Sequence, residues 1–206
     1  MKSLSKFVIV IAALLFATSS LKAQNTGGVE INVNYNVALP TGGLKDYVTR
    51  PSFRGFAGSL DYAIDNQWRV GLGFGFNDFY QKYPRQVYNN SDGAISAVIS
   101  NSIQQVPIMA HVNYTITKTG IIRPYIGAGA GINLISFDQY LGEFDDPSSK
   151  AKAIVQGEAG VFIPLSRYSS TAVKIGGTYN FAPFNEYGTK NLNSWGIQAG
   201  IRFPLH

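Results

Sequence analysis

Few residues in this sequence could do chemistry. The 206 residues include no cysteine and only two histidines, His111 and His206. Without cysteine, thiol catalysis, thiolate metal sites and disulfides are excluded, and two histidines give little support to an imidazole metal site. A catalytic histidine needs a nucleophile and an acid within reach, and no serine lies beside His111 at strand spacing. We therefore predict that His111 makes a structural hydrogen bond.

Two further segments resemble ligand sites only superficially. Gly127–Gly131 alternates glycine with alanine, but no Lys-Ser/Thr pair and no helical pattern follow it, as a phosphate loop requires. Glu143, Asp145 and Asp146 gather three acidic groups, but they lack the spaced oxygen ligands of a calcium loop. We predict that these glycines make room for longer side chains, that the acidic loop is solvated, and that the protein binds no metal or cofactor.

The first residues have the pattern of a secretory signal peptide. Two lysines precede an apolar run, Phe7–Ala17, and small residues lead to a cleavage site after Ala23. The apolar run is far shorter than the roughly 20 residues that a membrane-spanning helix needs. We therefore assign residues 1–23 to a signal peptide and residues 24–206 to one mature domain.

The leader also accounts for most of the basic charge. The whole chain has 17 basic and 12 acidic residues, and its formal net charge is +5. The leader holds three of the lysines and no acid, so the mature domain has 17 − 3 = 14 basic residues against 12 acidic ones, a net charge of +2. Nucleic-acid binding needs a basic stripe. None remains, so we predict no nucleic-acid partner.

The mature sequence alternates apolar and polar residues with a period of two. This period is that of a β-strand with two different faces, and no segment has the 3.6-residue period of a helix. One face carries aliphatic and aromatic residues, and the other carries asparagine, glycine, threonine and charged residues. Eight runs have this pattern: Val29–Leu39, Phe56–Ile64, Trp68–Phe76, Val106–Ile116, Pro124–Leu134, Ala153–Ile163, Val173–Phe181 and Trp195–Leu205.

The connections between these runs alternate in length. Long connections lie at about 40–52, 79–102, 137–150 and 183–192, and short ones at 65–66, 117–120 and 164–169. This alternation is typical of a transmembrane barrel with tight periplasmic turns and long external loops, and a sheet can cross a membrane only when it closes. We predict an all-β fold, an eight-stranded antiparallel up-and-down transmembrane β-barrel. The alternative is a soluble lipocalin-like binder with an apolar interior.

The inward face of the predicted barrel carries charges of both signs in equal number. A charge in a narrow lumen is costly unless it is paired. The interior of an eight-stranded barrel is just wide enough for side chains to fill it. Balanced charges can pair with one another there, so we predict a plugged lumen. The predicted lumen charge network consists of Glu30, Asp61, Arg69, Glu158, Lys174 and Arg202.

Aromatic residues gather near both ends of the predicted strands. Amphipathic rings favour the level of the lipid headgroups, so we predict two outward-facing girdles. The girdle at the short turns contains Tyr62, Trp68, Tyr114 and Phe203, and the girdle at the long loops contains Phe79, Tyr80, Phe137, Tyr140, Phe181, Phe184 and Trp195.

With this pattern the sequence resembles the small eight-stranded outer-membrane barrels of the OmpA-like type, part of the porin-like outer membrane β-barrel family. The resemblance implies a place in the outer membrane of a Gram-negative envelope. It also implies that the barrel-assembly machinery reads the last strand. The residues that match such an assembly signal are Gln198, Gly200, Phe203 and Leu205. Pro204 and the terminal His206 depart from the family's pattern.

Function is predicted mainly by this resemblance. We expect a non-enzymatic protein with a plugged lumen, which has a structural or interaction role through four external loops or as a subunit of an envelope complex. Outer-membrane lipid and an envelope or host-surface protein are the expected partners, and Tyr80, Tyr83 and Tyr88 are the expected external-loop contacts. A narrow channel for small solutes is the alternative, and a lipid-modifying enzyme is a third reading.

Overall fold

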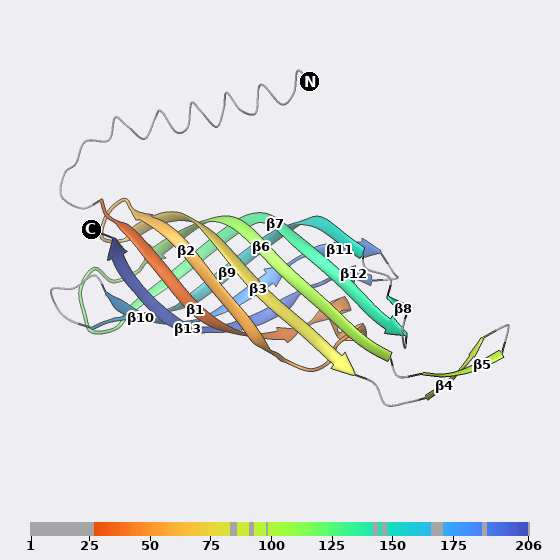
Figure 1. Cartoon of the computed structure of the whole chain (residues 1–206). Helices are drawn as coiled ribbons and strands as arrows, with labels where there is room; N and C mark the ends of the chain where they lie inside the picture. The colour runs from red at the N-terminus through yellow and green to blue at the C-terminus, as the bar shows by residue number, and fades with distance from the viewer. Residues whose placement is uncertain are drawn as a thin grey trace, which may run out of the picture.

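The computed structural model is dominated by one closed β-barrel (Figure 1). Residues 27–82, 86–90, 93–97, 99–141, 144–145, 148–165, 171–186 and 189–205 are described by the structure. The predicted signal peptide, residues 1–23, lies outside this part of the chain. Among the described residues, no helix has the length and apolar character needed to cross a membrane.

Eight long strands build the barrel wall. They are β1 (Val29–Pro40), β2 (Ser52–Ala63), β3 (Trp68–Lys82), β6 (Ile99–Thr115), β7 (Arg123–Leu141), β9 (Ser148–Pro164), β10 (Ala172–Phe181) and β13 (Ser194–Leu205). The shorter elements are η2 (Gly42–Asp46), β4 (Gln86–Asn90), β5 (Gly93–Ala97), β8 (Phe144–Asp145), β11 (Pro183–Glu186) and β12 (Thr189–Asn191).

The wall closes on itself, as the sequence predicted. The strands pair in the order β6-β3-β2-β1-β13-β10-β9-β7, and a further pairing of β6 with β7 completes the ring. Every pairing in the wall is antiparallel. Each backbone group in the wall can therefore bond to a neighbouring strand, which is what a hydrocarbon environment demands of a sheet.

The strands extend farther than the apolar runs that predicted them. β6 and β9 have 17 residues each and β7 has 19. Their external ends pair well beyond the apolar segments, for example at Ile99 and Leu141. The predicted loops at 79–102 and 137–150 were therefore too long. Hydropathy marks where the lipid-facing band stops, whereas backbone pairing continues past it.

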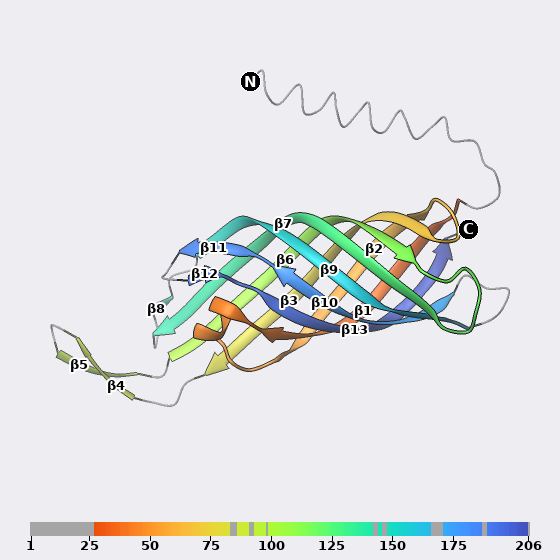
Figure 2. The same ribbon diagram turned by 180° about the vertical axis from the view of Figure 1, so that it is seen from behind.

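The short elements lie at the end of the barrel where the long connections are. Figure 2 shows β4, β5, β8, β11 and β12 at that end, while β1 begins and β13 ends at the other. The hairpin of β4 and β5 projects beyond the barrel in both views. We refer to the two ends as the external end and the short-turn end.

The two faces of the wall differ in the way that the alternation predicted. Outward-facing Leu72 is 66% exposed and Ile197 is 59% exposed, whereas inward-facing Asn32 is 2% exposed. The aliphatic and aromatic face therefore points out and the amide and charged face points in. This polarity rules out the lipocalin-like alternative, whose apolar face would point inward.

Candidate functional site in the barrel lumen

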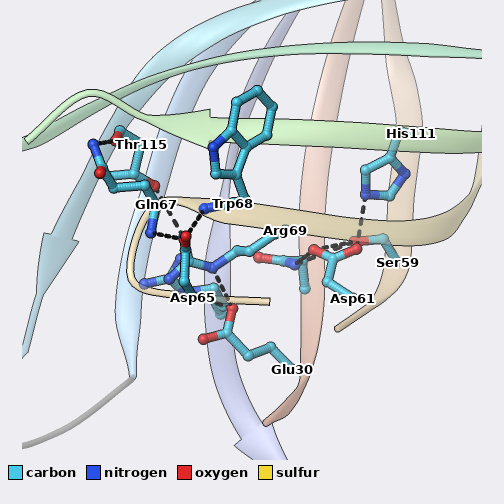
Figure 3. Close-up of polar contacts among 11 residues, drawn as sticks. Glu30, Ser59, Asp61, Asp65, Gln67, Trp68, Arg69, His111 and Thr115 are labelled. Carbon is cyan, nitrogen blue, oxygen red and sulfur yellow. Dashed lines mark hydrogen bonds and ion pairs between the residues drawn. The ribbon is translucent and has the colours of Figure 1, made fainter. Parts of the chain in front are cut away.

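The first polar cluster lies in the lumen near the short-turn end. Glu30, near the start of β1, accepts a hydrogen bond from Arg69 Nε of β3 at 2.8 Å (Figure 3). Nε of Arg202, on β13, lies 3.6 Å from the same carboxylate oxygen. The three side chains are at most 8% exposed. One carboxylate thus serves two buried guanidinium groups.

A hydroxyl and two aromatic rings complete this cluster. Arg69 Nη1 donates to Thr115 Oγ1 at 3.0 Å. The guanidinium carbon of Arg202 lies 4.1 Å from the ring centre of Phe162, and that ring stacks on Tyr125 at 4.3 Å. A cation over a desolvated ring is stabilised by the ring's quadrupole. We call the group the charged seal; its members are Glu30, Arg69, Thr115, Tyr125, Phe162 and Arg202.

A second cluster centres on the carboxylate of Asp61 on β2. Its Oδ2 accepts from Asn32 Nδ2 at 2.6 Å and from Ser59 Oγ at 3.3 Å. Its Oδ1 lies 2.7 Å from Nε2 of His111, on β6 (Figure 3). The Ser59 hydroxyl therefore points to the acid and makes no contact with the histidine. A serine nucleophile needs the histidine as its base; in this trio the serine and the histidine instead bind the two oxygens of Asp61.

Such contacts join side chains of two strands that flank a third one, and they depend on a glycine in the middle strand. Gly71 of β3 pairs with Asp61 on one side and with His111 on the other. A Cβ on Gly71 would lie only 2.2 Å from Asp61 Oδ1. The same arrangement recurs where Gly127 lies between Asn113 and Glu158. Glycine in the middle strand thus opens the path across which the flanking side chains meet.

Glu158 is the acid of the third cluster. Lys174 Nζ lies 3.2 Å and 3.3 Å from its two carboxylate oxygens. The Asn113 amide, in the orientation that satisfies both of its atoms, donates to Glu158 at 2.8 Å. Lys174 Nζ also lies 5.3 Å from the ring centre of Tyr125. This ion pair therefore borders the charged seal and continues the polar network toward mid-lumen.

The six residues predicted as a lumen charge network all lie inside the barrel. Five of them form ion pairs with one another and Asp61 contacts His111, but this pairing was not predictable from the alternation alone. The histidine that pairs with Asp61 was missing from the predicted network. Its signal was present, since His111 lies on the inward face of its strand. That the six residues block the lumen stays a prediction.

A small cavity separates the polar clusters from the external end. Its volume is about 50 Å³. Small residues of β2 and β3 line one side, and amides with the Lys174–Glu158 pair line the other. The lining includes Asn34, Asn36, Ala57, His111, Lys174 and Gln198.

A cluster of buried apolar side chains lies in the external half of the lumen. Leu44 and Val48 come from the connection between β1 and β2, and both are completely buried. They pack with side chains that point inward from the wall. We call this group the apolar seal; its members are Ala38, Leu44, Val48, Phe79, Ile103, Met109, Ile135, Phe137, Ile154, Ala182, Phe184 and Leu192.

The connection that carries Leu44 is fastened across the barrel mouth. Thr41 N donates to Asn193 O at 2.9 Å, and Gly43 N donates to Asn191 Oδ1 at 3.0 Å. Gly42 has a φ of 56°, in the left-handed region that favours glycine. The edge of the Tyr47 ring meets Phe137, with ring centres 5.1 Å apart. These contacts hold the segment against the external end of the barrel.

The predicted external girdle is wrong for three of its aromatic residues. Phe79, Phe137 and Phe184 lie in the apolar seal, with exposures of 0%, 8% and 3%. Phe79 follows Asn77 by two positions, so it shares that residue's inward face. Position along the strand suggested a girdle, but strand parity decides which side a ring faces.

The remaining girdle residues with described side chains are not buried. Tyr62, Trp68 and Phe203 are exposed near the short turns, and Trp68 lies 4.7 Å from Tyr114 between ring centres. Exposed members near the external end are Tyr80, Phe181 and Trp195. The side chain of Tyr140 lies outside the described part.

The predicted assembly-signal residues occupy both faces of β13. Gln198 and Gly200 point into the lumen, whereas Phe203 and Leu205 are exposed on the outer wall. Nothing in this geometry tests their role in assembly, so that role remains a prediction.

The predicted loop tyrosines have different positions. Tyr80 lies in strand β3, paired with Ser102, and is therefore not a loop residue. Tyr83 lies outside the described residues, and Tyr88 is described only by its backbone in β4.

The structure offers little support for ligand chemistry at the other candidates. Gly127–Gly131 lies inside strand β7, so it cannot form a phosphate loop before a helix. No group of three or more potential metal ligands occurs among the described residues. Glu143 and Asp146 lie outside them, and Asp145 is described only by its backbone in β8.

One titratable group in a short turn has a shifted pKa. Asp65 Oδ1 accepts hydrogen bonds from the backbone N–H groups of Trp68 at 2.6 Å and Gln67 at 2.7 Å (Figure 3). The bond from Trp68, followed by that from Gln67, lowers the pKa of Asp65 below its ordinary value of 3.8. The carboxylate therefore fixes the turn between β2 and β3 in its ionised form.

Comparisons with solved structures agree with this architecture. Neisserial surface protein A is 19% identical, with a TM-score of 0.57 over 88% of this chain and 100% of that one. Outer membrane protein W of Escherichia coli is 17% identical, with a TM-score of 0.48 over 89% and 100% of the two chains. Ail of Yersinia pestis is 18% identical, with a TM-score of 0.45 over 88% and 100%. At such identities a likeness concerns the fold alone, and the Neisserial protein, whose TM-score is above 0.5, supports the barrel architecture.

Sequence comparison identifies the family. No curated protein matches the sequence. The family described as outer membrane protein beta-barrel domain matches residues 8–203, nearly the whole chain. Together with the closed wall of eight antiparallel strands and its apolar outer face, this match locates the protein in the outer membrane. The chain belongs to the outer membrane protein beta-barrel domain family.

Proposed function

We propose that this protein is a non-enzymatic outer-membrane barrel with a closed lumen, which works through its external surface. The observation that carries the proposal is that different side chains fill the lumen toward its two ends. The charged seal fills the short-turn half, and the apolar seal fills the external half. The cavity between them has a volume of only about 50 Å³.

The chemistry of each closure supports a barrier to solutes. A hydrated ion would have to displace the paired guanidinium groups at one end, and doing so leaves buried charges unpaired. At the other end it would have to enter packed aliphatic and aromatic side chains, where an unpaired charge is strongly disfavoured. The structure therefore favours the plugged-lumen interpretation over the narrow channel.

The absence of an enzymatic role is supported by the contacts of the best nucleophile candidate. Ser59 donates to Asp61, and His111 binds the other oxygen of that carboxylate. All three residues line the lumen below the apolar seal, out of reach of a lipid headgroup or an external peptide. A hydrolytic reaction would need the serine and its base in contact at a substrate-accessible surface.

The remaining parts of the proposal concern partners and biogenesis. The apolar outer wall contacts outer-membrane lipid, and the elements at the external end contact an envelope or host-surface protein. Residues 1–23 direct export, and Gln198, Gly200, Phe203 and Leu205 present the assembly signal to the barrel-assembly machinery. The projecting β4–β5 hairpin supports external contact because it extends beyond the barrel (Figure 1).

Single-channel recording tests the closed lumen directly. The refolded protein is inserted into a planar bilayer, and heat-modifiable gel migration of the same sample verifies that the barrel is folded. We expect no conductance steps from folded protein. Reproducible steps would overturn the proposal and favour the narrow channel for small solutes.

A further inference from the structure

The short turn between β6 and β7 exposes apolar side chains (Figure 2). Ile121 is 77% exposed, Ile122 57% and Ile116 51%. A backbone hydrogen bond from Ile116 N to Pro124 O at 2.8 Å closes the turn, and Gly120 has a φ of 128°, in the left-handed region that favours glycine. Single exposed apolar residues are ordinary, whereas several close together mark an interaction surface. Three isoleucines in one short turn therefore point to a partner.

These side chains continue the lipid-facing wall past the girdle at the short turns. Tyr114 of that girdle pairs with Ile126, which is exposed on the outer face. Ile116 follows Tyr114 by two positions and Ile122 precedes Ile126 by four, and alternate residues share a face. Girdle rings mark the level of the lipid headgroups. The isoleucines therefore lie at this level or just beyond it, whereas the turn between β2 and β3 has the polar sequence Asp65–Gln67.

A shallow apolar groove lies in the outer wall between this turn and the external end. Its floor is formed by alanines of β6 and β7 that are exposed and that lie beside longer valine side chains. The pairing of Ala110 with Ala130 and of Val112 with Ala128 places the floor across these two strands. The lining residues that matter here are Ala110, Ala128, Ala130, Val70, Val112 and Val155.

The turn and the groove together span about one leaflet of the bilayer. Pro124, beside the turn, and Ala130, in the groove, are six residues apart on β7. A rise of about 3.3 Å per residue makes this about 20 Å along the strand. With a strand tilt of about 40° the depth covered is about 15 Å, which is about half of the roughly 30 Å hydrocarbon thickness. One acyl chain can therefore reach from the turn to the groove.

The charges of the turn favour an anionic headgroup. Lys118 and Arg123 flank the exposed isoleucines, and the turn contains no acidic residue. Asp65 of the neighbouring turn is near enough to interact with Lys118, and the buried Arg202 is near enough to interact with Arg123. The single acid balances one of the two turn cations. A net positive charge therefore remains at the headgroup level.

We infer that the outer wall of β6 and β7 binds one anionic phospholipid of the periplasmic leaflet, with its phosphate beside Lys118 and an acyl chain in the groove. The occupant is a lipid because the groove is continuous with the wall that faces the bilayer in this outer-membrane family. Basic residues at a membrane surface attract anionic headgroups, and the isoleucines fit the boundary between headgroups and chains. The inference rests on the proposed contact of the outer wall with lipid, and it adds the place and the lipid class.

The two tryptophans of the chain provide the test. Trp68 lies beside the site, with its ring centre 4.7 Å from that of Tyr114, whereas Trp195 lies on β13 near the external end. Trp195→Phe and Trp68→Phe each leave one fluorescent tryptophan in the mature protein. Each protein is refolded into phosphatidylcholine vesicles with the same fraction of brominated phosphatidylglycerol or brominated phosphatidylcholine, and a bromine quenches a tryptophan that it contacts.

We expect phosphatidylglycerol to quench Trp68 more strongly than phosphatidylcholine does. The difference should correspond to a local enrichment of about fivefold at low salt, the attraction expected from one unbalanced basic residue. Added salt should reduce the enrichment, because it screens exposed charges. Trp195 should show little or no preference between the two lipids.

A matched pair of lysine variants tests the role of the charge. In the protein that retains Trp68, Lys118→Gln should remove most of the preference for phosphatidylglycerol. Lys45→Gln removes an exposed lysine at the external end and should leave the preference unchanged. Arg123 is kept, because its Nε donates to Gly120 O at 3.4 Å within the turn.

A second pair of variants tests the groove. Ala128→Phe places a ring on the floor of the groove and should lower the quenching of Trp68 by phosphatidylglycerol. Ala199→Phe adds the same ring on the exposed outer face of β13 and should have no such effect. Heat-modifiable gel migration verifies that every variant is folded.

Three results would overturn the inference. The first is equal quenching of Trp68 by the two lipids, which would favour a protein partner for the turn. The second is a preference that survives Lys118→Gln unchanged, and the third is an equal preference at Trp195. If neither lipid quenched either tryptophan, the contact of the outer wall with lipid would itself be contradicted, so the two failures are distinguishable. Conductance of the same samples tests the closed lumen separately.

Discussion

The two halves of the lumen contain side chains of opposite chemistry. In the short-turn half, Glu30 accepts a hydrogen bond from Arg69 and forms an ion pair with Arg202. In the external half, side chains such as Leu44 and Phe79 exclude water by packing. The same strands enclose both halves, and their inward-facing residues change from charged near the short turns to mostly apolar near the external end.

The two halves differ because different parts of the chain can reach the lumen at each end. At the short-turn end the turns are too short to enter the lumen, so only strand residues occupy it. Long side chains such as arginine can reach across the lumen to a charged partner. At the external end a longer connection folds inward and supplies Leu44 and Val48. Removing one partner of a buried ion pair leaves an unpaired charge and strongly lowers the free energy of unfolding. Truncating a buried apolar side chain lowers it in proportion to the volume lost.

Removing the shared carboxylate should have the largest effect. Glu30→Gln keeps the side-chain volume but leaves two buried guanidinium groups without a charged partner. We expect the free energy of unfolding to fall by about 3–5 kcal/mol. Reversible urea unfolding in lipid vesicles, followed by tryptophan fluorescence, measures it. A loss below about 1 kcal/mol, the range of exposed pairs, would contradict the charged seal.

Truncation in the apolar seal should cost less. Leu44→Ala removes buried volume from the external half, and we expect a loss of about 2–3 kcal/mol in the same unfolding assay. Leu44→Met, which nearly conserves the volume, should lose less than about 1.5 kcal/mol. Equal losses in the two variants would show that volume is not what stabilises this half.

The short turn should contribute a smaller, pH-dependent effect. The lowered pKa of Asp65 means that its ionised form stabilises the fold at pH values above the ordinary pKa of 3.8, and that this contribution is lost as the pH falls through the lowered folded value. Asp65→Ala should therefore reduce the urea midpoint at neutral pH. The gap from wild type should close in strong acid; a gap that widens there would contradict the role.

An exposed ion pair provides the smallest effect and the control for the charged seal. Arg54 Nη1 lies 3.3 Å from Asp78 Oδ2, and the Arg54 side chain is 69% exposed. Arg54→Ala should cost at most about 1 kcal/mol, and added salt should reduce even that. Salt should leave the effect of Glu30→Gln nearly unchanged, because buried pairs are screened much less.

The features that could be predicted from the sequence are those that depend on the two-residue alternation of the strands. The alternation correctly assigned the inward faces of Glu30, Asp61 and Arg69 and the outward faces of Leu72 and Ile197. The prediction of an external girdle failed at Phe79 because the preference of aromatic rings for membrane interfaces was given more weight than the parity of the strand. The longer external ends of β6, β7 and β9 were missed because hydropathy stops marking strands outside the lipid.

What the sequence determined by itself was therefore local: eight strands, their two faces, and which charges must be buried. Only the tertiary structure decided which buried groups meet. Asp61 contacts His111 because the register of three strands brings both residues to Gly71. Leu44 is buried in the apolar cluster at the external end because its connection folds inward. Register and loop insertion depend on how the whole barrel closes and staggers, and no single strand carries that information.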